Sequence, residues 1–442
     1  MKKFVLAKKA SLIYLQLLFA WIGSQATAQV PSPALIGYFH NWNDASAPYI
    51  QLDQVDMRYN IIDVSFAVPQ VGTDYKMQFI PDQVSQAVFI SQMQTLQAQN
   101  RKVIISIGGA NSPVSLDNIM ERDSFVASMS NIINTYQFDG IDIDLEGSAL
   151  SVSGGTIAAP VDAHVIHLID AVKQIMADYY ATHNKHLILT MAPETAFVQG
   201  GQSAYGGIWG AYLPVLHALR DSLDLLHVQL YNSGSMYGID GNVYTQGTAD
   251  FIIAMCEAVI QGFNTSAGMF AGLPASKIAV GLPACPLAAG GGFTDTATVK
   301  SAIDYLRGTG PQPGNYILVN TTGYPSLKGM MTWSINWDAA AGCGGVYEYA
   351  TNYQNIFGIA SSDEEILRSK EILFYYDAIQ NILHVDASCC IAATLPVRIY
   401  NMSGQVVYSC VITNEINTIN ISLFPQGIYA ISAGGYHQKI MR

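Results

Sequence analysis

Short apolar runs alternate with longer amphipathic stretches between residues 31 and 357. The runs are rich in β-branched residues, whereas the stretches repeat apolar residues at helical spacing. This alternation predicts repeated strand–helix units on a parallel sheet. The predicted strands are Leu35–Phe39, Ile61–Ala67, Val103–Ile107, Gly140–Leu145, Leu187–Met191, Leu225–Leu230, Ile278–Leu282 and Gly329–Ser334. The clearest predicted helices are Asp82–Asn100, Asp123–Tyr136, Val161–Thr182 and Thr294–Leu306.

Eight strands over roughly 330 residues suit a (β/α)8 barrel, which usually takes about 250 residues and accepts insertions in its loops. The competing architecture is a doubly wound sheet, which would be favoured by Gly-x-Gly-x-x-Gly after the first strand. The first predicted strand carries Gly37-Tyr38-Phe39-His40 instead. We therefore expect an α/β fold of the (β/α)8 TIM barrel type.

The pattern changes around residue 361, where the composition turns polar. Beyond it, short runs such as Val397–Tyr400, Gln405–Tyr408 and Ile419–Leu423 alternate apolar and polar residues between turns. This predicts a small all-β sandwich of about 70 residues. We expect a signal peptide at residues 1–28, a barrel domain at 29–360, a linker at 361–371 and the sandwich at 372–442.

The first 28 residues contain four lysines, an apolar run from Leu12 to Ile22 and the small residues Ala26-Thr27-Ala28. This order is typical of a secretory signal cleaved near Ala28, and the run is too short to favour a membrane anchor. Loss of the lysines makes the formal charge of −12 more negative by four. Such a charge argues against nucleic acid or an anionic membrane as partner. No later stretch is long and apolar enough to span a bilayer.

Three carboxylates share one face of the predicted strand at 140–145. Successive side chains alternate faces, so Asp142, Asp144 and Glu146 line one face and apolar residues line the other. Like charges so close cannot all ionise, so at least one carboxyl becomes a candidate proton donor at neutral pH. Asp139 is off-phase, and we expect it to support the strand entrance. The alternatives are a solvated edge strand or a metal site, and the apolar opposite face favours a buried strand.

The spacing Asp139-x-x-Asp142-x-Asp144-x-Glu146 resembles the signature of glycoside hydrolase family 18, the chitinase family. The resemblance extends from about Ala34 to Ala350. Further matching segments are Ser106-Ile107-Gly108-Gly109, Met191-Ala192-Pro193-Glu194, Gln229-Leu230-Tyr231-Asn232 and Trp333.

This resemblance implies substrate-assisted hydrolysis of N-acetylated sugars with retention of configuration. Glu146 would protonate the glycosidic oxygen while the acetamido oxygen of the substrate attacks the anomeric carbon. Asp144 would hydrogen-bond the acetamido N–H and stabilise the positive charge of the intermediate. Asp142 would share a proton with Asp144, and Tyr231 would orient the acetamido carbonyl.

The resemblance also implies a set of binding residues at the strand ends. Trp333 would form an apolar floor beneath the distorted sugar, because aromatic faces pack on sugar C–H groups. For Tyr38 and Phe66, packing inside the barrel is the alternative. The expected substrate-binding residues are Trp333, Gln229, Met191, Tyr38, Phe66 and Asn232.

Other residues near the strand ends have simpler roles. Gln229 would support the position of Tyr231 from the same strand face. Gly108 and Gly109 would allow close backbone approach. Trp42, Trp209 and Trp337 are further candidate platforms for a sugar ring, with a surface or packing role as the alternative.

Neither histidines nor cysteines give a strong metal signal. His164-x-x-His167 falls on an expected outer helix, and there is no Cys-x-x-Cys, so we expect no metal and no cofactor. Cys256, Cys285 and Cys343 lie in the barrel region and three cysteines lie in the tail. At least one in each region is therefore free or paired across domains.

We expect a secreted or cell-surface chitinase that acts on chitin or N-acetylglucosamine oligomers. The interval Pro283–Lys328 is too short for the α+β insertion that deepens the groove of many chain-end cutters, so we predict an open cleft and endo-acting cleavage. The alternatives are an endo-β-N-acetylglucosaminidase on N-glycans and a non-catalytic chitin-binding lectin. The tail resembles the sorting domain of the type IX secretion pathway, which implies contact with that export machinery.

Overall fold

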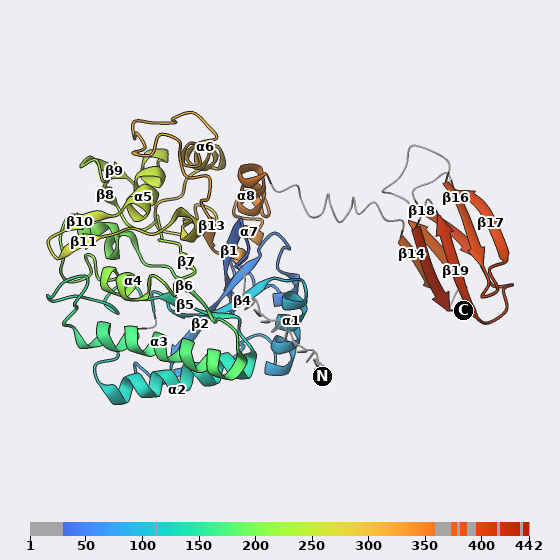
Figure 1. Cartoon of the computed structure of the whole chain (residues 1–442), viewed down its shortest axis with the longest axis horizontal. Helices are drawn as coiled ribbons and strands as arrows, with labels where there is room; N and C mark the ends of the chain where they lie inside the picture. The colour runs from blue at the N-terminus through green and yellow to red at the C-terminus, as the bar shows by residue number, and fades with distance from the viewer. Residues whose placement is uncertain are drawn as a thin grey trace, which may run out of the picture.

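Eight parallel strands form the central sheet of the computed structural model, in the order β12-β13-β1-β2-β4-β5-β6-β7 (Figure 1). Parallel bridges between Leu226 and Ile278 and between Gln229 and Gly281 bring the two end strands together, so the sheet is nearly closed. Helices lie outside it, and the predicted TIM barrel is confirmed. The strands are β1 Ala34–His40, β2 Ile61–Pro69, β4 Lys102–Gly108, β5 Gly140–Asp144, β6 Ile188–Met191, β7 Leu225–Leu226, β12 Ala279–Pro283 and β13 Gly329–Trp333.

The structure describes residues 30–111, 113–358, 373–377, 381–386, 395–412, 416–433 and 436–441. The predicted signal peptide and the predicted linker at 361–371 lie outside these residues, as does the cysteine pair at 389 and 390. No helix in the described ranges has the length and apolar character needed to cross a bilayer.

The helices start where side chains cap them, which explains small differences from the predicted bounds. Ser85, Asn118 and Asp295 each accept a hydrogen bond from a backbone N–H in the first turn. The α-helices are α1 Gln86–Ala98, α2 Ile119–Tyr136, α3 Ala163–His183, α4 Leu213–Leu219, α5 Ala249–Gln261, α6 Thr296–Leu306, α7 Ile335–Ala339 and α8 Glu348–Phe357.

Short elements fill the loops at the rim. The 3-10 turns are η1 Leu52–Gln54, η2 Thr195–Phe197, η3 Gln199–Gln202 and η4 Ala275–Lys277. The small strands are β3 Met77–Gln78, β8 Ser235–Tyr237, β9 Val243–Thr245, β10 Phe263–Thr265 and β11 Gly268–Phe270. Between β12 and β13 the chain forms one helix, α6, as the sequence predicts.

The barrel interior is layered. Its lower layer is apolar and fully buried, with side chains from alternate positions of the strands. The next layer toward the carboxyl ends of the strands is polar and equally buried, at 0–1% exposure. The apolar layer contains Ala34, Ile36, Ile61, Ile104, Ile188, Leu225, Ala279 and Met331. The polar layer contains Tyr38, Asp63, Ser106, Asp142, Thr190 and His227.

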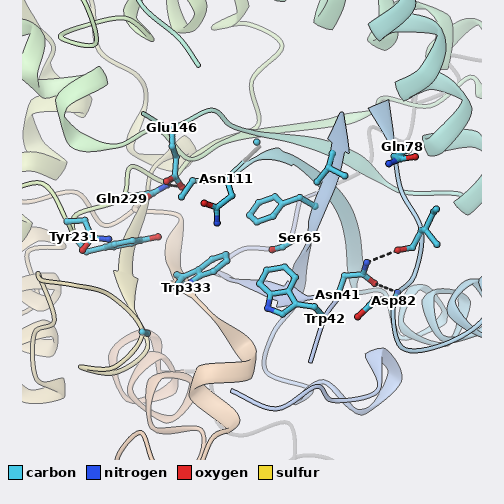
Figure 2. Close-up of a pocket in the computed structure, with 18 residues that line it drawn as sticks. Asn41, Trp42, Ser65, Gln78, Asp82, Asn111, Glu146, Gln229, Tyr231 and Trp333 are labelled. Atoms are coloured by element: carbon cyan, nitrogen blue, oxygen red, sulfur yellow. Dashed lines mark hydrogen bonds between the residues drawn. The ribbon is translucent and has the colours of Figure 1, made fainter. Parts of the chain in front are cut away.

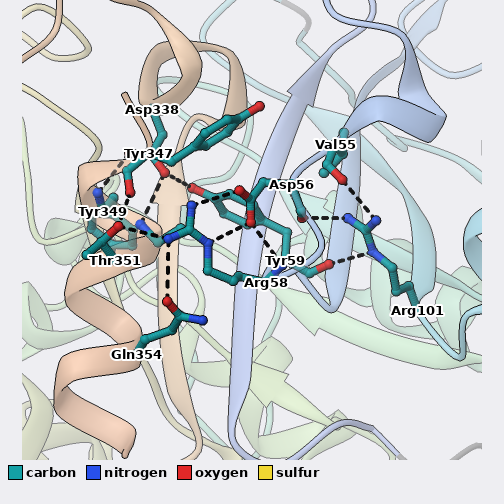
Figure 3. A network of polar contacts seen from close by, with 11 residues as sticks. Val55, Asp56, Arg58, Tyr59, Arg101, Asp338, Tyr347, Tyr349, Thr351 and Gln354 are labelled. Carbon is teal, nitrogen blue, oxygen red and sulfur yellow. Dashed lines mark hydrogen bonds and ion pairs between the residues drawn. The ribbon is translucent and has the colours of Figure 1, made fainter. Parts of the chain in front are cut away.

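A buried carboxylate joins the end of the barrel to its beginning (Figure 3). Asp338 on α7 accepts hydrogen bonds from the Tyr59 hydroxyl at 2.6 Å and from the backbone N–H groups of Tyr349 and Ala350 at 2.8 and 3.1 Å. Burial raises its pKa to about 6. Arg101 nearby donates three hydrogen bonds to backbone carbonyls of the segment that leads into β2. These contacts hold α7 and α8 beside the first strands.

The described cysteines fall into one pair and two free thiols. Cys285 and Cys343 form a disulfide that joins the loop after β12 to the segment between α7 and α8. Cys256 is buried and free, and Cys410 in the tail is also free. One barrel cysteine is therefore left unpaired, which agrees with the odd count in that region.

Two antiparallel sheets share one core beyond residue 372. One sheet has the order β14-β15-β18 and the other has the order β17-β16-β19-β20. The predicted small all-β domain is confirmed. Its strands are β14 Leu373–Asp377, β15 Ile382–Asp386, β16 Leu395–Tyr400, β17 Val406–Ile412, β18 Ile416–Asn420, β19 Ile428–Ala433 and β20 Tyr436–Met441.

Candidate active site

A cleft of about 580 Å³ opens at the carboxyl ends of the barrel strands. Glu146 lies at one end of it with Gln229, Tyr231 and Trp333, and Asp82 lies at the other (Figure 2). Of the described residues that line this cleft, Glu146 and Asp82 are the two with carboxylates. Among these residues, Glu146 is therefore the one carboxylate at its end of the cleft, and the second carboxylate, Asp82, lies at the far end.

The three acids of β5 step outward from the barrel interior. Asp142 is fully buried, Asp144 is 2% exposed, and Glu146 follows the strand and is partly exposed. This is the one-face arrangement that the alternating sequence predicts. Asp142 accepts hydrogen bonds from three hydroxyl groups, those of Tyr38 at 2.7 Å, Ser106 at 2.7 Å and Thr190 at 2.6 Å.

One amide group links the upper two acids. The Gln229 Nε2 atom donates to Asp144 Oδ1 at 2.8 Å, to Glu146 Oε1 at 2.9 Å and to the carbonyl of Ala192 at 3.0 Å. We expected Gln229 to support Tyr231. In the structure it contacts the acids themselves, and the carbonyl of Ala192 fixes which of its atoms faces them.

Burial shifts both upper acids toward their protonated forms. The pKa of Asp144 is raised well above its usual value by burial and then by the charge of Glu146. Burial also raises the pKa of Glu146, while the hydrogen bond from Gln229 lowers it and the charge of Glu194 raises it again. Two ionised carboxylates about 4 Å apart would repel by roughly 4 kcal/mol at an effective dielectric constant of about 20. This repulsion favours states in which the pair keeps one proton.

Aromatic side chains form a continuous platform along the cleft. The Trp333 and Phe66 rings are stacked with centroids 6.0 Å apart, and the Trp42 and Phe66 rings are stacked at 6.4 Å. Beneath Trp42 lies His40, with ring centroids 4.6 Å apart and an interplanar angle of 9°. Such a surface suits the C–H face of sugar rings.

The paired glycines after β4 bring the backbone close to the acids. Gly108 and Gly109 have φ angles of 102° and 72°, which favour glycine. A Cβ atom on Gly108 would collide with the carbonyl of Asp144, and one on Gly109 would collide with the Phe66 ring. The Gly109 N–H donates to the carbonyl of Asp144 at 2.7 Å.

Several predicted residues lie beside the cleft rather than in it. Tyr38 and Met191 are 1% and 0% exposed and lie below its surface, so direct contact with a ligand is not proposed for them. Asp139 lies just before β5, where its carboxylate accepts hydrogen bonds from the Val103 N–H at 2.9 Å and from Gln97 at 3.1 Å.

Asn232, in contrast, lines the cleft as predicted for a binding residue, and its side chain accepts a hydrogen bond from the Gly291 N–H at 3.1 Å.

The two histidines of α3 have structural partners. His164 Nε2 lies 2.7 Å from the carbonyl of Ser151, and His167 Nδ1 lies 2.7 Å from the carbonyl of Leu116. Each contact anchors a loop to the helix.

Residues 34–364 match the family described as Glycosyl hydrolases family 18. The chain belongs to this family. Residues 379–442 match a second family, described as Secretion system C-terminal sorting domain.

Two relatives of the family 18 domain share nearly half of their aligned residues with it. Chitinase Chi52 of Paenibacillus xylanexedens is 46% identical over 322 residues, which cover 72% of this chain and 61% of that protein. Chitinase D of Niallia circulans is 46% identical over 323 residues, with the same shares. The chain thus spans 61% of the length of each of these relatives.

A solved structure agrees with the family assignment. The crystal structure of a family GH18 chitinase from Chromobacterium violaceum matches with a TM-score of 0.67 at 36% identity. The match covers 76% of this chain and 86% of that chain.

Some residues of this family 18 site were not apparent from the sequence. The Tyr212 hydroxyl accepts a hydrogen bond from the Leu145 N–H at 2.7 Å, which fixes the backbone between Asp144 and Glu146. Thr190 contacts Asp142 from the neighbouring strand β6. A threonine in a buried strand has no distinctive spacing, whereas its register opposite Asp142 would have identified it once the strands were aligned.

Proposed function

We propose that this chain hydrolyses β-1,4 linkages between N-acetylglucosamine units of chitin, with retention of configuration and with help from the acetamido group of the substrate. The observation that carries the proposal is the arrangement at Glu146, a partly exposed acid whose pKa is raised by burial and which shares an amide donor with Asp144. The names of the family relatives, Chitinase Chi52 and Chitinase D, support chitin as the substrate.

In this mechanism Glu146 is the general acid. It gives its proton to the glycosidic oxygen, and later removes a proton from the water that completes hydrolysis. The absence of a second carboxylate opposite Glu146, among the described residues that line the cleft, supports a nucleophile that comes from the substrate. The acetamido oxygen attacks the anomeric carbon and forms an oxazolinium intermediate.

The neighbouring groups hold and stabilise that acetamido group. Asp144 accepts a hydrogen bond from its N–H and offsets the positive charge that develops on the ring. Tyr231 lines the same end of the cleft and donates to the acetamido carbonyl, which sets the angle of attack. Trp333 supports the sugar ring from below and excludes water.

We also propose that cleavage is endo-acting. The interval between β12 and β13 contains the helix α6 and loops, with no added strands among its described residues. The α+β insertion that would deepen the groove on this side of the barrel is therefore not part of this interval. A polymer chain can then enter along its length rather than by its end. The sorting domain at 379–442 supports export to the cell surface or beyond, where an insoluble polymer is accessible.

The substrate assignment is tested with the purified protein, chitin oligomers of six sugars and a high-mannose glycoprotein. We expect oligomers to be cut at internal bonds and the glycoprotein to stay intact, with products resolved by mass spectrometry. Release of only terminal disaccharides would contradict endo action. Release of the glycan with no cleavage of the oligomers would replace chitin with N-glycans as the substrate, and binding to chitin with no cleavage of either would indicate a lectin.

A further inference from the structure

Two ionisable side chains beneath the catalytic acids have no described hydrogen-bond partner. Asp63 on β2 and His227 after β7 are both 0% exposed, and neither the Asp63 oxygens nor the His227 ring nitrogens make a hydrogen bond within the part of the chain that the structure describes. Buried polar groups are rarely left unpaired, because each costs free energy. A pair of such groups in the centre of a barrel therefore calls for a functional reason.

The two groups face Asp142, the innermost acid of β5. The His227 Nε2 atom lies 3.6 Å from Asp142 Oδ1 and 3.7 Å from Asp63 Oδ2, so it sits between the two carboxyl groups. Both separations exceed a direct hydrogen bond by less than an ångström, so a small movement of the imidazole ring would reach either side. The other titratable groups that face this centre are Tyr38 from β1, which donates to Asp142, and Asp144 from β5.

Burial shifts the pKa values of the two groups in opposite directions. It raises the pKa of Asp63, with a further rise from the charge of Asp142, and it lowers the pKa of His227, which the charge of Asp142 partly restores. A carboxyl group with a raised pKa and an imidazole with a lowered pKa can exchange one proton at little cost.

This inference rests on the proposed function and on the proton that Asp142 would share with Asp144, which the family resemblance implies. Asp144 interacts with Glu146 through its own proton and through the Gln229 amide. Asp142 accepts hydrogen bonds from three hydroxyl groups and has no cation in hydrogen-bond contact among the described residues. A proton passed from Asp144 to Asp142 changes the charge at this position.

We propose that Asp63 and His227 act as a buried pair that shares one proton and thereby balances the charge of Asp142 during catalysis. While Asp142 is an anion, the proton lies on His227 Nε2 and Asp63 is ionised. When Asp142 accepts the proton of Asp144, the proton on His227 moves to Asp63 and leaves a neutral imidazole. The number of protons in the group is unchanged, so no exchange with solvent is needed. Both are positioning residues that act through Asp142 and Asp144.

A bound cation is the rival explanation for this centre. Ligand atoms of Asp63, Asp142 and His227 lie within 4.8 Å of one another, which is compact enough for an ion. The three hydroxyl donors already occupy most of the acceptor capacity of Asp142, and a shared proton satisfies His227 without a further ligand. We therefore favour the proton.

The test compares Asp63→Asn, His227→Gln and the double variant, with kcat and KM measured on chitin oligomers across pH. His227→Gln removes the imidazolium next to Asp142, and Asp63→Asn removes the carboxylate that stabilises this imidazolium and accepts its proton, so each change raises the pKa of the acid pair. We expect each single variant to move the acid limb of the kcat profile upward by about one pH unit, with kcat about tenfold lower at acidic pH and KM within about twofold. Because the two act as a unit, the double variant should match either single variant.

The controls separate this proposal from a structural role and from the proposed function. The exposed residues His217 and Asp221 provide His217→Gln and Asp221→Asn as matched changes that should leave the profile unaltered. An unmoved acid limb, or shifts that add in the double variant, would overturn the shared proton even if thermal stability falls. One equivalent of tightly bound metal with activity lost in EDTA would also overturn it. If Glu146→Gln stays active, the proposed function fails instead, whatever these variants do.

Discussion

Replacement of Glu146 with glutamine should lower kcat on chitin oligomers by about 10²- to 10⁴-fold, the contribution of a positioned general acid. Glutamine keeps the size of the side chain and its place beside Gln229, but it cannot give a proton to the leaving oxygen. The rate is measured from new reducing ends over a range of pH. The wild type should lose activity on the alkaline side as Glu146 loses its proton, and the residual rate of the variant should lack that limb.

A matched change elsewhere separates chemistry from folding. Glu121 at the start of α2 is, like Glu146, a partly exposed glutamate, but it does not line the cleft, and Glu121→Gln should leave kcat and KM unchanged. Binding of oligomers to Glu146→Gln, followed by tryptophan fluorescence of the Trp333 and Trp42 platform, should remain close to that of the wild type. Activity of Glu146→Gln within a few-fold of the wild type would remove Glu146 from the role of acid.

Replacement of Asp144 with asparagine should lower kcat by about 10²-fold or more, a loss typical of a single electrostatic contact in the transition state. Asparagine can still contact the Gln229 amide through its oxygen, but it carries no charge to offset the developing oxazolinium. KM should change much less than kcat, because the charge appears only as the bond breaks. Steady-state kinetics on the same oligomers measure both constants.

The comparison for this variant is Asp123→Asn, at an exposed position of α2. It makes the same chemical change far from the acids of β5 in sequence and should have no effect. If Asp144→Asn raises KM in proportion to its loss of kcat/KM and leaves kcat intact, Asp144 contributes to ground-state binding and not to the charge of the intermediate.

Period-two spacing was sufficient to predict the acid stack. Asp142 and Asp144 share one face of β5 because alternate residues of any strand do so, and Glu146 follows directly after the strand with the same spacing. The strands themselves were found from apolar runs with small errors at their ends. The strand expected at 225–230 is shorter, since Leu225–Leu226 is the regular part and Gln229 pairs by isolated bridges.

Contacts that bring together residues from several strands could not be predicted from the sequence alone. Tyr38, Ser106 and Thr190 converge on Asp142 from β1, β4 and β6, and their separation along the chain gives no hint of it. Helix α5 was not among the clearest predicted helices, because Phe251–Val259 is buried on all sides and so lacks the amphipathic period that identifies a surface helix.

The buried pair of Asp63 and His227 was not predicted, because its two residues come from separate strand segments, as the hydroxyl groups around Asp142 do. Each is a lone polar residue in an apolar strand segment, and burial of one such residue is usually satisfied by packing and a local hydrogen bond. Only the closed barrel places them 3.7 Å apart and next to Asp142.

In the proposed mechanism the substrate supplies the nucleophile through its acetamido group. The most direct measurement is the identity of the sugar at each new reducing end after the protein digests a partly N-acetylated chitosan, read by mass spectrometry of the released oligomers. We expect N-acetylglucosamine at every new reducing end, because only that sugar can form the oxazolinium intermediate. Glucosamine at new reducing ends in proportion to its content in the polymer would contradict it.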